Sequence, residues 1–182
     1  IGTTSKGELK RPRSLQTADT LPQLTTHPEK RAVAFFIAEI LYKCLKAHTP
    51  EPKTYDFAET FIHLLETSEN GLATLHLIFL MQFSRLLGFF PDTGFSPQRP
   101  YFDLYNGHFT AGRPNHHFYL DLETSAAWHD LMQVNFSESA AYSPAYTQRQ
   151  QLMEALLNYY RQHVHGFGDM KSLYVLQELY RK

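Results

Sequence analysis

The sequence contains a single cysteine, Cys44, among its 182 residues. One thiol can form neither an internal disulfide nor a cysteine-based zinc site, so packing alone must stabilise the fold. Such sparse cysteine usage fits a reducing compartment, and we expect a cytoplasmic protein. The sequence also lacks a phosphate-binding glycine loop, a Gly-x-Ser-x-Gly nucleophile motif and a paired-carboxylate pattern. These absences favour an interaction protein over an enzyme, with no cofactor and no catalytic residue expected.

There is no long uninterrupted apolar run. The most apolar stretch, residues 72–90, is broken by five residues: His76, Gln82, Ser84, Arg85 and Gly88. A charged residue at the centre of a membrane helix costs about 2.5–3.5 kcal/mol. The stretch therefore predicts a buried helix of a soluble bundle with no membrane association. The first residues lack the pattern of a signal peptide, and Ile1-Gly2-Thr3-Thr4 resembles the middle of a longer chain, so we expect a fragment.

Neither sign of charge dominates the whole chain, which has 17 Lys and Arg against 18 Asp and Glu. Residues 1–31 hold six basic and three acidic groups, a net charge of +3, which leaves 11 basic and 15 acidic groups, or −4, for the remainder. This imbalance argues against nucleic-acid binding by the bulk charge of residues 32–182. Hydrophobic residues make up 43% of the chain, with 14 Phe, 11 Tyr and one Trp, enough for a packed core.

Apolar residues recur at helical spacing in most of the chain. Thr26 and Glu29 resemble a capping box at the start of the first helix, and Thr147 with Gln150 resembles another. The predicted helices cover residues 26–47, the segment between the breaker at 49–52 and the turn at 69–71, then 72–87, 124–134, 148–163 and 170–180. The expected fold class is mainly α, a bundle of five or six helices.

Residues 91–123 interrupt the helical pattern with four prolines and short aromatic pieces. Asn106-Gly107 stands between the segments 101–105 and 108–110 and predicts a small β-hairpin, because both residues tolerate a positive φ. An irregular insertion that carries this hairpin is therefore expected.

Histidines in and after the insertion are the candidates for chemistry. His108, His116, His117 and His129, with Asp121 as a partner, could serve a metal-dependent enzyme, which stays open as an alternative. Their spacing matches no metal motif, so surface histidines explain them more simply. Cys44 lies on the apolar face of the first helix and is expected in the core rather than as a nucleophile.

Two further groups are candidates for binding. The basic residues Lys10, Arg11, Arg13, Lys30 and Arg31 could contact DNA phosphates, although a solvated linker and a helix start explain them equally well. Aromatic residues beside a cation could form a pocket for an acidic, hydrophobic peptide, with core packing as the alternative: Phe79, Phe83, Phe89 and Phe90 beside Arg85.

Three strings together resemble the C-terminal domain of the RecO family of bacterial recombination mediators. They are residues 36–42 (Phe-Ile-Ala-Glu-Ile-Leu-Tyr), residues 75–80 with 86–91 (Leu-His-Leu-Ile-Phe-Leu and Leu-Leu-Gly-Phe-Phe-Pro), and residues 170–179 (Met-Lys-Ser-Leu-Tyr-Val-Leu-Gln-Glu-Leu). Their order and spacing match the family over most of residues 25–181. The aromatic insertion stands where the family has a variable module.

The resemblance implies a division at residue 24. Residues 1–24 would be the last strand and linker of a mostly missing oligonucleotide-binding barrel, and residues 25–182 the helical domain, whose insertion (91–123) has lost the zinc module found in some members. The family binds single- and double-stranded DNA, anneals strands and, with RecR, loads RecA onto DNA coated by single-strand-binding protein. It recognises the acidic tail of that protein through the helical domain. The resemblance thus implies no enzyme, and Arg85 and Lys171 are our candidates for contacts to the tail. A helical interaction scaffold without a DNA role remains a further alternative.

Overall fold

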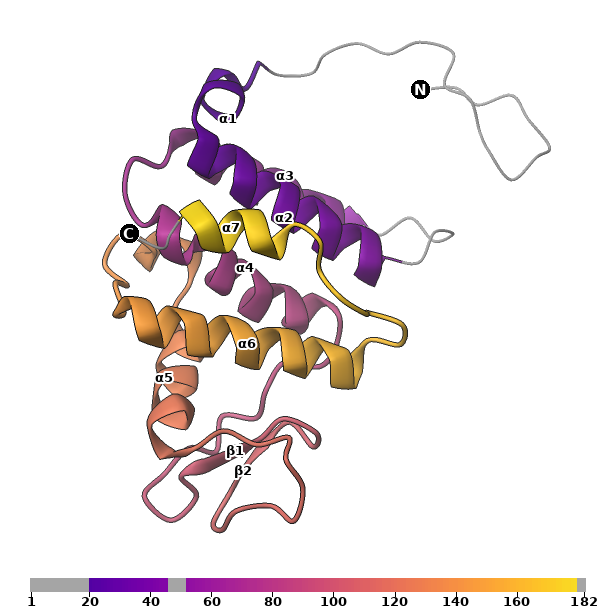
Figure 1. Cartoon of the computed structure of the whole chain (residues 1–182), viewed down its shortest axis with the longest axis vertical. Helices are drawn as coiled ribbons and strands as arrows, with labels where there is room; N and C mark the ends of the chain where they lie inside the picture. Colours follow the sequence, from indigo (N-terminus) through magenta and orange to yellow (C-terminus); the bar gives the residue numbers. More distant parts are fainter. Residues whose placement is uncertain (1–19, 46–51, 180–182) are drawn as a thin grey trace, which may run out of the picture.

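The computed structural model describes residues 20–45 and 52–179, which form a helical bundle with a β-hairpin at one end (Figure 1). The helices are α1 (Pro22–Thr26), α2 (Pro28–Cys44), α3 (Pro52–Thr67), α4 (Leu72–Leu86), α5 (Leu122–Gln133), α6 (Tyr146–His163) and α7 (Leu173–Leu179), with a 3-10 turn at Phe136–Glu138. The strands are β1 (Tyr101–Asp103) and β2 (His108–Thr110). The mainly α fold class is confirmed, and the short α1 stands where the sequence predicts a linker.

Helix α4 lies at the centre of the bundle. It packs against α2, α3, α5 and α6, and an unbroken run of its side chains, residues 74–81, is buried. This burial explains why the stretch is apolar on every side, since a helix covered all round needs no polar face. Helices α1 and α7 pack on α2 instead of α4.

Two of the predicted capping boxes are wrong, although both helices begin within two residues of the predicted starts. Thr26 is the last residue of α1, and its hydroxyl donates to the Pro22 carbonyl at 2.8 Å instead of capping α2. Helix α6 begins at Tyr146, and no side chain caps it. Helix α5 has a real cap, because the Asp121 carboxylate accepts a hydrogen bond from the Thr124 N–H at 2.8 Å. The predicted helix ends at Ala47 and Tyr180 lie outside the described residues.

The hairpin forms where Asn106-Gly107 predicts it, with Phe102 paired to Phe109 in an antiparallel register. Of the two turn residues, Gly107 takes a positive φ, +72°, and Asn106 does not. The Asp103 carboxylate organises the turn instead, by accepting hydrogen bonds from the backbone N–H groups of Tyr105 and Asn106 at 2.9 and 3.0 Å. The turn therefore depends on one buried carboxylate and one glycine.

Aromatic packing fixes the insertion to α5 and α6. The ring of Phe102 lies 5.1 Å from that of Trp128 and 5.8 Å from that of Tyr159, both of which are buried. The Ser125 hydroxyl of α5 accepts a hydrogen bond from the Phe102 N–H at 2.9 Å. The hairpin is thus part of the same core as the bundle. None of the described helices is long and apolar enough to cross a membrane.

Candidate partner-binding site

The outer face of α2 is apolar, although helix surfaces exposed to water are usually polar. Phe35, Ala38, Tyr42 and Leu45 follow one another at helical spacing and are all exposed. The exposed fractions of Phe35 and Tyr42 are 66% and 86%. We call these four residues the α2 stripe. Contiguous exposed apolar residues of this kind mark interaction surfaces more often than isolated ones do.

A hollow of about 590 Å³ lies beside the stripe, where α2 meets the segment before α7. Its lining combines two aromatic side chains with two lysines and two hydrogen-bonding groups: Phe35, Tyr42, Lys43, Lys171, Glu39 and Ser172. The Lys43 ammonium donates to the Phe167 carbonyl at 3.0 Å. Lys171 is exposed, and among the described residues its ammonium has no hydrogen-bond or ion-pair partner. The hollow therefore offers an apolar wall and an available cation.

Glu39 is the acidic group of the hollow, but its carboxylate is occupied. It accepts hydrogen bonds from the backbone N–H groups of Lys171 and Ser172 at 2.9 and 2.8 Å, and from the Ser172 hydroxyl at 2.6 Å. Burial raises the pKa of Glu39, but the hydrogen bonds from Ser172 and Lys171 outweigh it, and the pKa lies below its ordinary value. The Glu39 carboxylate therefore fixes the backbone at the start of α7.

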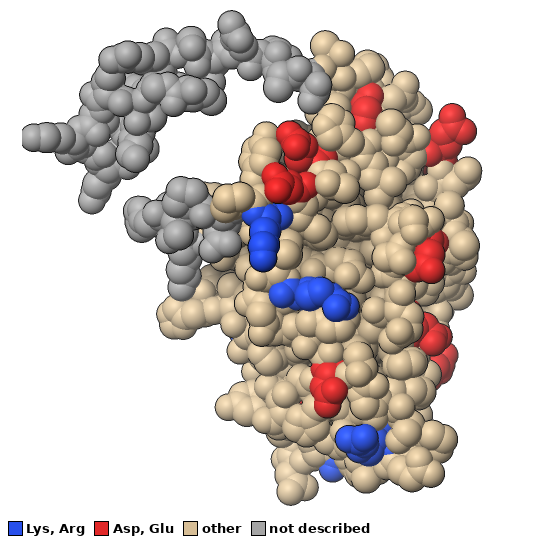
Figure 2. Space-filling view, turned by 180° about the vertical axis from the view of Figure 1, so that it is seen from behind, with Lys and Arg blue, Asp and Glu red and all other residues tan. Residues whose placement is uncertain are grey.

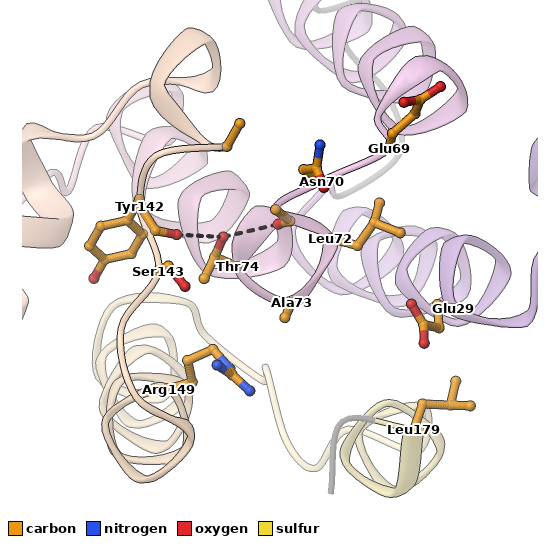
Figure 3. A pocket seen from close by; sticks show the side chains of 12 residues that line it. Glu29, Glu69, Asn70, Leu72, Ala73, Thr74, Tyr142, Ser143, Arg149 and Leu179 are labelled. Carbon is orange, nitrogen blue, oxygen red and sulfur yellow. Dashed lines mark hydrogen bonds between the residues drawn. The ribbon is translucent and has the colours of Figure 1, made fainter. Parts of the chain in front are cut away.

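A second hollow, of about 400 Å³, opens at the N-terminus of α4 (Figure 3). Arg149 extends into it from α6, while Glu29 and Glu69 line it from α2 and from the loop before α4. At the rim of this hollow, the Thr74 hydroxyl is hydrogen-bonded to the carbonyls of Gly71 and Tyr142. Two carboxylates against one guanidinium make this hollow a poor site for an acidic ligand.

Comparison with known proteins decides what the bundle is. The family model described as the C-terminal part of recombination protein O matches residues 26–173. The chain belongs to the RecO family. Similar proteins named DNA repair protein RecO occur in Phocaeicola vulgatus (31% identity over 94% of this chain and 70% of that protein) and Bacteroides fragilis (31% over 97% and 72%). Another, from Flavobacterium psychrophilum, is 30% identical over 97% of this chain and 72% of its own.

This RecO-family chain has a role in DNA repair and recombination, as the sequence resemblance implies. No solved structure gives a significant match to it.

The pocket predicted around Phe79 and Phe83 requires correction. Both side chains are fully buried and pack against the rings of Phe57 and Phe61, so they are core residues and line no surface pocket. Phe89 faces α6, where its ring stacks on that of His163 at 5.3 Å. Arg85 and Lys171 have different neighbours as well. The Arg85 guanidinium lies 3.8 Å from the ring centre of Phe90, whereas Lys171 lies beside Glu39.

Of the predicted DNA-binding residues, Lys10, Arg11 and Arg13 lie outside the described residues. Lys30 is only 5% exposed, and its ammonium donates to the Glu66 carbonyl at 2.5 Å, so it is a structural residue and cannot reach a phosphate. Arg31 is exposed and bonds to the Thr25 carbonyl. On the face of the molecule shown in Figure 2, basic side chains are separated by uncharged surface and mixed with acidic ones.

The histidines of the insertion do not assemble a metal site within residues 20–45 and 52–179, where no three His, Cys, Asp or Glu side chains come together. His116 instead faces Asp103, with 3.3 Å between Nε2 and Oδ2. His129 stacks on Phe95 at 4.7 Å. Burial raises the pKa of the Cys44 thiol to about 12 despite the nearby Lys43, which agrees with a thiol of low reactivity.

Sequence reasoning missed the α2 stripe, although a signal for it exists. The first predicted helix has apolar residues on its outer face as well as its inner one, and Phe35 and Tyr42 are seven residues apart, which places them two turns apart on one side. The hollow itself could not be predicted, because Lys171 reaches it from the other end of the chain.

Proposed function

We propose that this RecO-family chain binds the acidic C-terminal tail of single-strand-binding protein in the hollow beside the α2 stripe. The observation that carries the proposal is the combination of the exposed rings of Phe35 and Tyr42 with the available ammonium of Lys171. An acidic tail that also carries apolar side chains needs both, an apolar surface to cover and a cation for its carboxylates. The charge of the Glu39 carboxylate opposes such a ligand, but the Lys43 ammonium, 3.9 Å from it, offsets that charge.

Binding of the tail would bring the mediator to DNA coated by single-strand-binding protein. In this proposal residues 25–182 act as the partner-binding domain and residues 1–24 lead out of a DNA-binding barrel. The barrel engages single- and double-stranded DNA for strand annealing, and RecR joins the complex for loading of RecA. The protein acts by binding and not by covalent chemistry, and it works in the cytoplasm, where the chromosome lies.

The experiment is fluorescence polarisation of a labelled peptide that copies the tail, titrated with the chain at two salt concentrations. We expect saturable binding that weakens as salt rises, because part of the attraction is between exposed charges. Lys171→Glu and Tyr42→Ala should each weaken binding by about fivefold or more. Arg113→Glu, an equal charge reversal at the hairpin end, is the matched control and should leave the affinity unchanged.

Arg85→Glu separates the two candidate cations. If this variant loses binding while Lys171→Glu and Tyr42→Ala bind normally, the tail lies at the end of α4 and the hollow is the wrong site. If all three bind like the unaltered chain, recognition of the tail by this face of the domain is refuted.

A further inference from the structure

The insertion lies at the hairpin end of the bundle, whereas α2 and α7 lie towards the other end (Figure 1). Two of its aromatic side chains, Tyr105 and Phe118, are 59% and 44% exposed. Their rings lie 5.8 and 6.3 Å from that of His116, with interplanar angles of 59° and 40°. Rings tilted in this way form no flat platform for a stacked ligand, but an exposed ring still attracts a cation to its face.

Hydrogen bonds fix the position of Phe118. Its N–H donates to Nδ1 of His116 at 3.2 Å, and its carbonyl accepts from the Leu104 N–H at 2.9 Å. The His116 ring is held in turn by the buried Asp103 carboxylate, with 3.3 Å between Nε2 and Oδ2. The Phe118 ring is therefore positioned before any ligand arrives, which lowers the entropy lost on binding.

A cavity of about 320 Å³ lies beside Phe118, where the insertion meets α5 and α6. Its polar lining consists of two carboxylates, one imidazole and three neutral side chains: Asp121, Glu154, His117, Thr124, Gln151 and Asn158. None of the described residues that line the cavity is a lysine or an arginine. A ligand that enters therefore meets two negative charges beside an aromatic wall, and both features favour a cation.

Both carboxylates are able to accept hydrogen bonds from a ligand. Asp121 uses Oδ1 to cap α5, by accepting from the Thr124 N–H at 2.8 Å, and its Oδ2 accepts no hydrogen bond from any described residue. Glu154 is exposed on α6, and its carboxylate has no hydrogen-bond or ion-pair partner within the described ranges. The cavity thus has at least three carboxylate oxygens available for a ligand.

The cations around the cavity do not neutralise it. The Arg161 guanidinium donates to the amide oxygen of Asn158 at 2.9 Å and lies 3.5 Å from the Asp169 carboxylate. Arg113 is close enough to Asp121 for their charges to interact, but it is exposed and its guanidinium lies 5.8 Å from the ring centre of Tyr101. One exposed guanidinium leaves the two carboxylates with an excess negative charge.

We propose that this cavity binds the guanidinium of an arginine from a basic segment of a partner protein. A guanidinium has five N–H donors in one plane, so it can donate to Asp121 and Glu154 while its face lies against the Phe118 ring. Arginine suits this lining better than lysine, whose donors all diverge from one nitrogen. The exposed Tyr105 ring is available to the flanking residues of the same segment.

The inference goes beyond the binding of the acidic tail and does not depend on it. The hollow beside the α2 stripe presents Lys171 to an acidic ligand, whereas this cavity presents carboxylates to a basic one. Opposite charges keep each ligand from the other site. The domain therefore has two docking surfaces, which can be occupied at the same time.

The test is fluorescence polarisation of a short labelled peptide in which arginine alternates with glycine, titrated with the full chain. The same peptide with citrulline in place of arginine has the same shape without the charge and should not bind. Glu154→Lys should weaken binding of the arginine peptide by at least about fivefold. Asp121→Asn and Phe118→Ala should each weaken it about two- to fivefold. Glu69→Lys, an equal charge reversal at an exposed position before α4, is the matched control and should leave the affinity unchanged.

Two of the substitutions are chosen so that the fold survives. Asparagine is as good a helix cap as aspartate, so Asp121→Asn removes the charge and keeps the start of α5. Phe118→Tyr keeps the ring and should bind like the unaltered chain. Urea denaturation shows that each variant is folded before its affinity is measured.

The proposal is overturned if Glu154→Lys and Phe118→Ala bind the arginine peptide like the unaltered chain. It is also overturned if Glu69→Lys loses as much affinity as Glu154→Lys, because net charge would then explain the attraction. Equal binding of a lysine peptide, or equally strong competition by spermidine, would assign the cavity to organic cations in general and contradict a site for arginine.

Discussion

The Glu39 carboxylate of α2 and the Ser172 backbone and hydroxyl, 133 residues later, form two hydrogen bonds of 2.8 and 2.6 Å. This contact closes the N-terminus of α7, whose first N–H groups have no partner within the helix. It also brings Lys171 next to α2 and so creates the hollow beside the α2 stripe. One carboxylate therefore links the stability of the last helix to the geometry of the proposed partner site.

Replacing Glu39 by Gln should lower the free energy of unfolding by about 2 kcal/mol, because charge-assisted hydrogen bonds are replaced by weaker ones. The pKa of Glu39 is lowered in the folded chain. Its contribution is therefore present above the unfolded pKa of about 4.3 and is lost as the pH falls through the folded value. Urea denaturation at pH 7 measures the change. Glu29→Gln, on the exposed first turn of α2, is the control and should cost less than about 1 kcal/mol. An equal loss in both variants would contradict the assignment.

Gly107 should not tolerate a side chain. A Cβ at this position would lie 2.9 Å from the hydroxyl oxygen of Tyr159, and the φ of +72° is unfavourable for any other L-residue. Gly107→Ala should destabilise the chain by at least about 2 kcal/mol in urea denaturation. Gly112→Ala is the control, because nothing lies within 4 Å of its Cβ position and its φ is not positive. In a Tyr159→Phe background the penalty at Gly107 should be smaller, since the hydroxyl is gone. An undiminished penalty would assign the whole effect to φ.

Much of the fold was predictable because its signals are local. The spacing of Val33, Phe36, Ile37 and Ile40 predicts the inner face of α2, and all four are buried. Gly88 ends α4 with a φ of +83°, as its position after an apolar run indicates. The capping residues were less predictable. Thr26 precedes the start of α2, but it is also the last residue of α1, which the sequence does not predict. Its hydroxyl therefore donates to the Pro22 carbonyl within α1 and does not cap α2.

The candidate site was predictable only in part, because burial and long-range contacts are not local properties. Phe79 and Phe83 are of the residue type that lines apolar pockets. They are covered by the rings of Phe57 and Phe61, which belong to α3 and are distant in sequence. Lys30 has the charge of a phosphate contact, yet it is covered by the end of α3. Lys171 was selected as a cation from the resemblance alone, and nothing in its sequence neighbourhood indicates that it faces α2.

Lys30 and Arg31 are adjacent in sequence but should respond differently to substitution. Lys30→Met keeps the apolar stem and removes the buried ammonium, which leaves the Glu66 carbonyl without this donor. We expect a loss of about 2 kcal/mol in urea denaturation and no change in DNA affinity. Arg31→Met removes an exposed group and should cost less than about 0.5 kcal/mol. Weaker DNA binding by Lys30→Met at unchanged stability would show that the ammonium leaves its buried position to meet a phosphate.

His76 should make the stability of the chain depend on pH well above the range in which carboxylates titrate. It is 5% exposed on the central helix, and its ring meets that of Phe36 edge-on at 6.0 Å. Burial and, secondarily, the charge of Arg149 lower the pKa of His76 to about 3, against the opposing effect of a hydrogen bond to the Leu72 backbone. His76 therefore binds a proton near pH 6.5 in the unfolded chain but not in the folded chain. Stability is full above pH 6.5 and falls as the pH decreases towards 3.

Between pH 6.5 and pH 5 the expected loss is about 2 kcal/mol, at about 1.4 kcal/mol per pH unit. Glu39 and Asp103 do not contribute in this window, because their lowered pKa values keep them ionised. Urea denaturation of the unaltered chain and of His76→Leu at a series of pH values measures the effect. His76→Leu should have a nearly constant free energy of unfolding from pH 6.5 to pH 5, whereas His108→Gln, at an exposed position, should keep the slope. A slope that survives in His76→Leu would mean that another group takes up the proton on unfolding.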